Sequence, residues 1–396
     1  MSKRKVGELV QKRPVPRPQS ETGNAITKGS SSSSAYGRSS WGNWWYRWSW
    51  GMAGTPSRPL NVVITGATRD IGFALAEEHL KNGDNVFVHG LRREAVDDVV
   101  RRFSERFPDQ VIWGMAGDVA DPDFVRMMGM YAQKWLGRID AWINSAAITY
   151  PRKRRFLETK PTEFARVMNM NLLGLLYGTQ TASLIMRSQN QGGHIFNVEA
   201  SDNAPTPQFA AYGASKASMP QILKTLVVEL QGTKVGVHNI APGLALTALQ
   251  LAGHWTDLDS LRVFNILAEK PETIAKSLVP QIRRTACSRS STGSTIRYMS
   301  QSHVLWRCMT SGWRVNRWFD IWNGGLPAFN ASALFGESCA GDEEAPAPPT
   351  PPQLSVEDDF GDEEEQGDGC DGPPKKWSTW QRRRIKTHYL RSSQRR

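Results

Sequence analysis

The fold is decided by the stretch Asn61-Val62-Val63-Ile64-Thr65-Gly66-Ala67-Thr68-Arg69-Asp70-Ile71-Gly72. Its first part is a β-branched run of the kind that forms a buried parallel strand. Glycine follows directly, and Ile71, Ala74 and Leu75 then recur at helical spacing. A strand, a glycine turn and a helix in this order bring backbone amides close to a phosphate at the helix N-terminus. We therefore expect residues 61–72 to begin a nucleotide-binding α/β fold.

The same alternation of strands and helices continues along the chain. We expect a long helix over 163–187, a second around Tyr212, and a decaying pattern after Leu251 that is typical of a variable substrate-binding loop region. Six alternations with short connections predict a doubly wound parallel sheet, a Rossmann-like three-layer α/β domain. The further strands are expected at 85–88, 111–113, 140–144, 194–198 and 234–240.

Charge separates this domain from the two ends of the chain. The net charge is +7 over 1–57, −13 over 337–374 and +9 over 375–396, within an overall +11. Segments of this composition bury too little apolar surface to fold, so we expect disordered tails around a catalytic domain at 58–320. Because the acidic and basic tails can pair with each other, we expect no nucleic-acid partner. Binding of the basic segments to an anionic membrane surface or to nucleic acid stays open as the alternative.

The cysteines and the N-terminal segment bear on the compartment. No Cys-x-x-Cys pair occurs, so we expect no metal site, no disulfide framework and a reducing compartment. The basic, acid-poor residues 1–57 are compatible with an organelle transit peptide, and without that role the protein would be cytoplasmic. Their tryptophan-rich run at 41–50 either anchors at a bilayer interface or is a low-complexity tract without function.

A candidate catalytic pair lies in Tyr212-Gly213-Ala214-Ser215-Lys216. Positions four apart share one face of a helix, so both side chains can point into the same cleft. A neighbouring ammonium lowers the pKa of a tyrosine that must donate a proton near neutral pH. The spacing is common by chance, but downstream of a nucleotide-binding turn it predicts carbonyl reduction.

The end of the second expected strand bears on the cofactor. An acidic residue there would bind a ribose 2′-hydroxyl and favour NAD, but the chain has His89-Gly90-Leu91-Arg92-Arg93. Arginines fit the 2′-phosphate of NADP, and Arg69 lies in the glycine turn. We therefore expect NADPH rather than NADH, although Arg92 and Arg93 would also serve simply to solvate a helix start.

These motifs resemble the short-chain dehydrogenase/reductase family over about residues 59–250. The resemblance implies catalytic roles for Tyr212, Lys216, Ser201 and Asn171. It also implies a set of cofactor-binding residues that comprises Thr65, Gly66, Arg69, Ile71, Gly72, Arg92, Arg93, Asp118, Val119, Asn144, Tyr212, Lys216, Pro242, Gly243 and Thr247.

The resemblance also implies what these catalytic residues do. Lys216 would bind the nicotinamide ribose, and Asn171 would either hold a water of a proton relay or bond to backbone. The family's serine normally stands thirteen residues before the tyrosine, where this chain has Glu199. Ser201, eleven residues before Tyr212, is therefore expected to polarise the carbonyl oxygen of the substrate.

Segments on the substrate side narrow the resemblance to chlorophyll(ide) b reductases of the non-yellow-coloring type. This likeness implies reduction of the C7 formyl group of chlorophyll b or chlorophyllide b, in the chloroplast at the thylakoid membrane, by a self-associating protein. Another carbonyl substrate, or a scaffold without activity, stays open. The segments that carry the likeness are 192–197, 205–216, 237–243, 264–269 and 278–283.

Three departures from the family pattern predict weakened activity. Asp70 takes the place of the middle glycine and puts a carboxylate near the pyrophosphate. Ala147 stands where a glycine lets the chain pass near the cofactor ribose. Pro220 falls within the helix expected around Tyr212 and removes an amide that would bond to the Lys216 carbonyl.

Overall fold

A parallel sheet of seven strands organises the computed structural model, which describes residues 58–150, 153–199, 205–252, 254, 257–288, 292–322 and 325–327. The strand order is β3-β2-β1-β4-β5-β6-β7. Because the order reverses between β1 and β4, a crevice is expected outside their carboxyl ends. The strands are β1 (Asn61–Thr65), β2 (Asn85–Gly90), β3 (Ile112–Ala116), β4 (Ala141–Asn144), β5 (Gly193–Val198), β6 (Val235–Ala241) and β7 (Thr295–Arg297).

Helices cover both faces of the sheet, which confirms the expected three-layer architecture. Val62 and Ile64 of β1 belong to a core with α2 (Asp70–Lys81), α3 (Arg93–Arg106) and α11 (Pro271–Ala286). Val63, between them, belongs to the core on the opposite face. This alternation is the period of two that a strand buried on both faces requires. The second core is covered by α4 (Pro122–Leu136), α6 (Gly174–Ser188) and α8 (Met219–Glu229).

The long helix expected over 163–187 is interrupted at Asn171. The structure has α5 (Pro161–Met168), a π-helical turn η2 (Asn169–Leu173) and then α6. A π turn inserts an extra residue into the helical ladder and occurs frequently at functional sites. Apolar periodicity does not reveal it, because the helix continues on both sides.

Pro220 does not lie within the Tyr212 helix, so the expected disruption there is wrong. Helix α7 (Ala210–Ala217) ends at Ser218, and α8 begins at Met219 with Pro220 in its first turn. The first turn of a helix leaves its amides unpaired, so a proline there costs no hydrogen bond.

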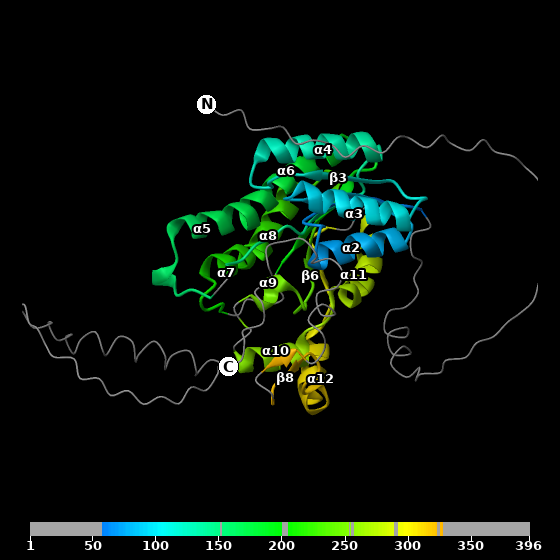
Figure 1. The fold of residues 1–396 in the computed structure, drawn as a ribbon. Coiled ribbons are helices and arrows are strands. Elements are labelled where there is room, and N and C mark those ends of the chain that lie inside the picture. The colour runs from blue at the N-terminus through cyan, green and yellow to red at the C-terminus, as the bar shows by residue number, and fades with distance from the viewer. Residues whose placement is uncertain are drawn as a thin grey trace, which may run out of the picture. The chain divides into compact units, whose positions relative to one another are not determined.

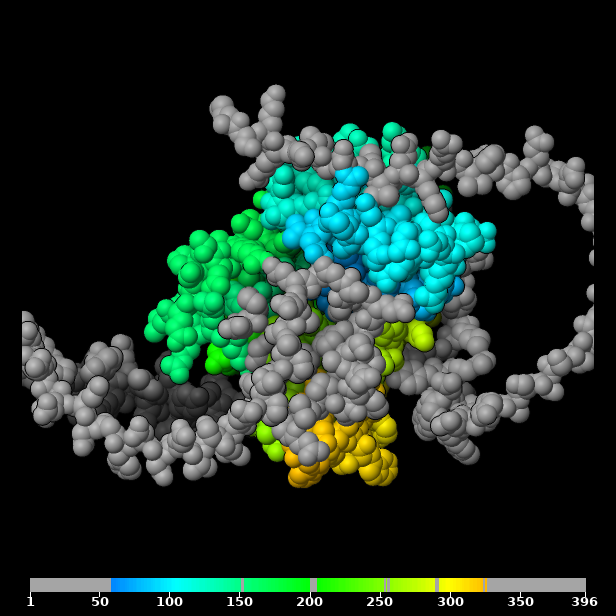
Figure 2. All heavy atoms as spheres, in the orientation of Figure 1, coloured from blue at the N-terminus to red at the C-terminus, as the bar shows by residue number. Residues whose placement is uncertain are grey.

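The segment after Leu251 is not a loop region, as its decaying pattern suggested. It holds β7 and three helices, of which α11 covers the sheet. Helices α10 (Leu258–Leu267) and α12 (Gln301–Met309) lie together with β8 (Phe319–Asp320) in Figures 1 and 2, beside a small separate core that includes Leu261 and Phe319. The short remaining elements are η1 (Phe156–Glu158), α9 (Ala248–Leu251), η3 (Ser311–Arg314) and β9 (Leu326–Pro327).

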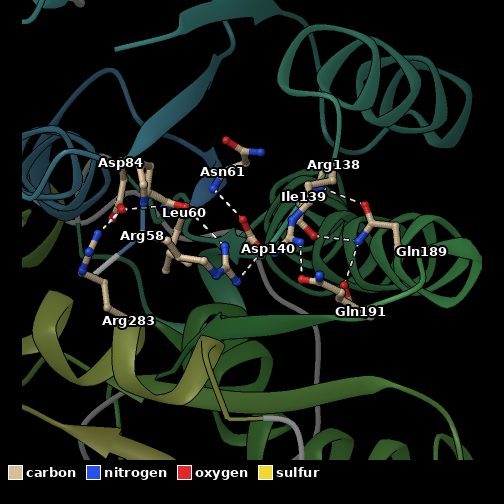
Figure 3. A network of polar contacts seen from close by, with 12 residues as sticks. Arg58, Leu60, Asn61, Asp84, Arg138, Ile139, Asp140, Gln189, Gln191 and Arg283 are labelled. Atoms are coloured by element: carbon tan, nitrogen blue, oxygen red, sulfur yellow. Dashed lines mark hydrogen bonds and ion pairs between the residues drawn. The ribbon is translucent and has the colours of Figure 1, made fainter. Parts of the chain in front are cut away.

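Two buried carboxylates hold the start of β1 (Figure 3). Asp84 accepts a hydrogen bond from the Leu60 amide at 2.8 Å and lies 2.7 Å from His79 Nδ1, and it also pairs with buried Arg283 of α11. Asp140 accepts from the Asn61 amide at 2.9 Å. Burial alone would raise the pKa of Asp84, but the bonds from His79 and Arg283 outweigh it and lower that pKa. Asp84 therefore stabilises the fold in its ionised form.

We predict that Asp84→Asn lowers the free energy of unfolding at pH 7 by about 3–5 kcal/mol, because it removes the carboxylate that pairs with the buried Arg283 charge. Urea denaturation measures this change. The difference from wild type should shrink as the pH falls through the lowered pKa of Asp84, since the wild-type carboxylate is then protonated as well. Asp98→Asn, on α3 with 42% of the carboxylate side chain exposed, is the matched control and should change the free energy by less than about 1 kcal/mol. An equal loss in both variants would contradict the prediction.

Candidate active site

The glycine turn after β1 has the shape of a phosphate cradle. Gly66 has φ +67°, and a Cβ added there would lie 2.7 Å from the Ala146 Cα. A Cβ on Gly72 would lie 2.1 Å from the Gly66 carbonyl oxygen. Neither position accepts a side chain, so the backbone itself forms the surface in front of the N-terminus of α2. Such a surface binds anions through amide groups and the helix dipole.

Asp70 departs from this cradle in conformation as well as in charge. Its φ is +55°, a left-handed conformation that glycine adopts freely and that costs other residues about 1–2 kcal/mol. The Arg69 guanidinium lies 3.8 Å from its carboxylate and partly compensates the charge. The left-handed conformation of Asp70 could not be predicted, because a backbone angle cannot be read from composition.

The loop after β4 is fixed against the glycine turn. Thr65 Oγ1 accepts hydrogen bonds from the amides of Ser145 at 3.0 Å and Ala146 at 3.2 Å. The Asn144 side-chain amide, expected to contact the cofactor, donates to Asn197 Oδ1 at 2.9 Å within the core. Asn144 thus joins β4 to β5 and fixes the position of the loop that carries Ala147.

His89 is a residue of the cofactor side that the sequence reasoning missed. The Gly66 amide donates to its Nδ1 at 3.3 Å, and its Nε2 lies 3.0 Å from the Gly117 carbonyl oxygen and must carry the hydrogen. Burial lowers the pKa of His89 to about 4, so the ring is neutral at pH 7 and can accept the Gly66 bond. The only signal in the sequence was a histidine at the carboxyl end of a strand.

The other residues expected at the cofactor lie at the carboxyl ends of the strands or just beyond them. Arg92 and Arg93 are exposed at the start of α3, where Arg93 lies 3.6 Å from Asp97. Asp118 follows β3 and is exposed, whereas Val119 is buried. Beyond β6, Gly243 has φ +79° and Thr247 Oγ1 accepts from the Gln250 amide at 3.2 Å at the start of α9.

Tyr212 and Lys216 lie one turn apart on α7, as the spacing predicted. Lys216 is buried, and its Nζ donates to the Val198 carbonyl oxygen at the end of β5 at 2.9 Å. Burial lowers the pKa of Lys216 to about 8. Burial also raises the pKa of Tyr212 to about 12, the opposite of the lowering expected from its lysine neighbour. The effect of burial on the phenol therefore exceeds that of the ammonium in the resting site.

Asn171 bonds to backbone, which is one of the two roles considered for it. Its Nδ2 donates to the Ile148 carbonyl oxygen at 2.9 Å and to Ser215 Oγ at 3.2 Å, and its Oδ1 accepts from the Ile148 amide at 2.8 Å. The π turn thus connects the loop after β4 to α7, next to Lys216. Ser215 was not identified from the sequence, although it lies between the two catalytic candidates.

Ser201 lies outside the described residues, so its expected role stays a prediction. The family position thirteen residues before Tyr212 is described, and Glu199 there is buried at the end of β5. Its amide donates to the Ile240 carbonyl oxygen at 2.9 Å, which extends the pairing of β5 with β6.

The chain shares these features with a known family. A family model described as "short chain dehydrogenase" matches residues 60–254. The chain is 40% identical over 247 residues to "Chlorophyll(ide) b reductase NOL, chloroplastic" of Arabidopsis thaliana, covering 61% of this chain and 70% of that protein. The rice (Oryza sativa subsp. japonica) NOL protein is 38% identical over 247 residues, which are 61% of this chain and 72% of its own length.

A further relative is longer than this chain. "Probable chlorophyll(ide) b reductase NYC1, chloroplastic" of Arabidopsis thaliana is 36% identical over 293 residues, which are 70% of this chain and 58% of that protein. The chain thus spans little more than half the length of this relative. The family match over residues 60–254 includes the glycine turn and the Tyr212–Lys216 pair. The chain belongs to the short-chain dehydrogenase family of nicotinamide-dependent oxidoreductases.

Proposed function

We propose that the protein reduces the C7 formyl group of chlorophyll b or chlorophyllide b to a hydroxymethyl group, with NADPH as reductant. The observation that carries the reaction class is the Tyr212–Lys216 pair on α7, with the lysine held at the carboxyl end of β5. The choice of substrate is supported by the identity of 38–40% to two chlorophyll(ide) b reductases named NOL.

The residues of the glycine turn fit a dinucleotide cofactor. At Gly66 and Gly72 the backbone of Ala146 and of Gly66 itself lies where a Cβ would be, so only glycine allows the tight turn that would bring backbone amides to a pyrophosphate. Arg69, Arg92 and Arg93 would hold the 2′-phosphate that distinguishes NADPH from NADH. When bound, the reduced cofactor supplies a hydride to the formyl carbon.

Tyr212 completes the reduction as the proton donor. Its phenol gives a proton to the carbonyl oxygen as this oxygen gains negative charge, and a hydroxymethyl group results. A pKa of about 12 does not prevent this step, because an alkoxide is a stronger base than a phenolate. The Lys216 ammonium, one turn away on α7, stabilises the phenolate that remains.

Exposed tryptophan side chains support the proposal that the protein acts on a pigment held in a membrane. Trp306, Trp313 and Trp322 expose 54%, 90% and 80% of their surface. Tryptophan side chains favour the interface between a bilayer and water. Within the described residues, no helix is long and apolar enough to cross a bilayer. We propose a peripheral association with the thylakoid membrane of the chloroplast, by a homo- or hetero-oligomer.

We predict that Tyr212→Phe lowers kcat for chlorophyllide b at least about 100-fold, since a positioned general acid contributes a factor of this size or more. The loss of the formyl absorption band measures turnover, and calorimetric titration measures NADPH binding, which should persist. Tyr131→Phe, on α4, is the control and should keep full activity. Unchanged turnover in Tyr212→Phe would contradict the proposed role.

We predict that Asp70→Gly binds NADPH more tightly. Removing one carboxylate near the phosphates should make the binding free energy of NADPH more favourable by about 1 kcal/mol. Calorimetry would measure this as a roughly fivefold lower dissociation constant. Asp70→Asn removes the charge but keeps a side chain, so a similar gain there would identify charge as the cause. A weaker affinity in both variants would contradict the prediction. If wild type and Asp70→Gly both fail to bind millimolar NADPH, the alternative of a scaffold without activity gains support.

We predict that Arg92→Ser weakens NADPH binding roughly 10- to 100-fold and leaves NADH binding almost unchanged, because a hydrogen bond between charged groups contributes about 1.5–3 kcal/mol. Titrations with both cofactors measure this ratio. Arg101→Ser removes an exposed arginine farther along α3 and is the matched control. An equal loss of affinity for both cofactors would mean that Arg92 does not recognise the 2′-phosphate.

A further inference from the structure

A buried carboxylate lies at the centre of the proposed active site. Glu199 is 7% exposed and directly follows Val198, whose carbonyl oxygen accepts the Lys216 ammonium. A buried carboxylate costs several kcal/mol unless it is paired or hydrogen-bonded, so its partners indicate its role.

The neighbouring strands fix this carboxylate from one side. Asn239 of β6 donates through Nδ2 to Glu199 Oε2 at 2.5 Å. The Arg297 guanidinium of β7 lies 3.8 Å from Oε1, with half of its side chain exposed. These two contacts restrain the carboxylate at the carboxyl edge of three adjacent strands, whose pairing sets the distances between them.

Lys216 acts on the carboxylate from the helix side. The Lys216 residue is 7% exposed, and burial lowers the pKa of its ammonium, whereas the charge of Glu199 raises it. The hydrogen bond to the Val198 carbonyl gives the ammonium only a dipole, whereas Glu199 gives it a countercharge. The charged groups that act on Glu199 are thus Lys216 of α7 and Arg297 of β7.

We infer that Glu199 is a positioning residue of the reductase site: its carboxylate, held by Asn239 and Arg297, keeps the Lys216 side chain charged at the end of β5. The inference rests on the proposed function in one respect, that Lys216 must be an ammonium to assist Tyr212. It assigns a role to the position where the family pattern has a serine. Burial raises the pKa of Glu199 above its ordinary value, and the hydrogen bond from Asn239 and the charges of Arg297 and Lys216 oppose this rise.

The test is the variant Glu199→Gln, which keeps the shape and the acceptor for Asn239 but removes the charge. Competitive labelling with acetic anhydride, followed by mass spectrometry of the Lys216 peptide, gives the pH midpoint at which this amine becomes reactive in the full chain. Removing an opposite charge near an ammonium lowers the pKa of the amine, so we expect the midpoint to fall by about one unit. Glu272→Gln removes an exposed carboxylate of α11 and should leave the midpoint in place.

Turnover gives a second readout. Reduction requires the ammonium, so the rate should decline as pH rises through the pKa of Lys216, and in Glu199→Gln this decline should begin about one unit lower. Glu199→Asp keeps the negative charge, so its decline in rate should begin at a pH between those of wild type and Glu199→Gln. An unmoved labelling midpoint, or a loss of rate equal at every pH, would overturn the inference. If the midpoint moves but wild type does not reduce chlorophyllide b, the proposed substrate fails and the role of Glu199 stands.

Discussion

The position of β1 is the constraint on which the site depends. Asp84 and Asp140 bind the amides of Leu60 and Asn61 at the start of the strand, and Thr65 Oγ1 holds the loop after β4 at its end. Both ends are therefore fixed by bonds to other parts of the sheet. Since the glycine turn follows β1 directly, the register of this central strand determines where the cofactor phosphates would lie.

The candidate site then follows from the parallel arrangement. All seven strands point the same way, so the residues that follow β1, β2, β4, β5 and β6 share one edge of the sheet. Polar side chains connect these ends: His89 joins β2 to the glycine turn, and Asn144 joins β4 to β5. Asn171 brings in the π turn and α7. Residues far apart in the sequence thus become neighbours.

The fold could be predicted from the sequence because it depends on local patterns, and the same patterns indicate the candidate residues, whose roles stay predictions. β-branched runs, glycine turns and the Tyr212–Lys216 spacing are visible within a few residues. What could not be predicted depends on distant parts of the chain. The left-handed conformation of Asp70 and the π turn at Asn171 leave no periodic signal, and β7 is too short for one. The contacts of Glu199 come from β6 and β7, so its sequence neighbours do not indicate them.

Two departures from the family pattern share a physical feature. Asp70 and Glu199 are acids where the pattern has glycine and serine, and each lies 3.8 Å from a partly exposed arginine. A partly exposed pair is screened by water, so each arginine compensates its acid only in part. On the cofactor side, the remaining negative charge opposes phosphate binding. On the catalytic side, it favours an ammonium at Lys216. An acid in place of the family residue therefore weakens the cofactor side of the proposed site at Asp70 and strengthens its catalytic side at Glu199.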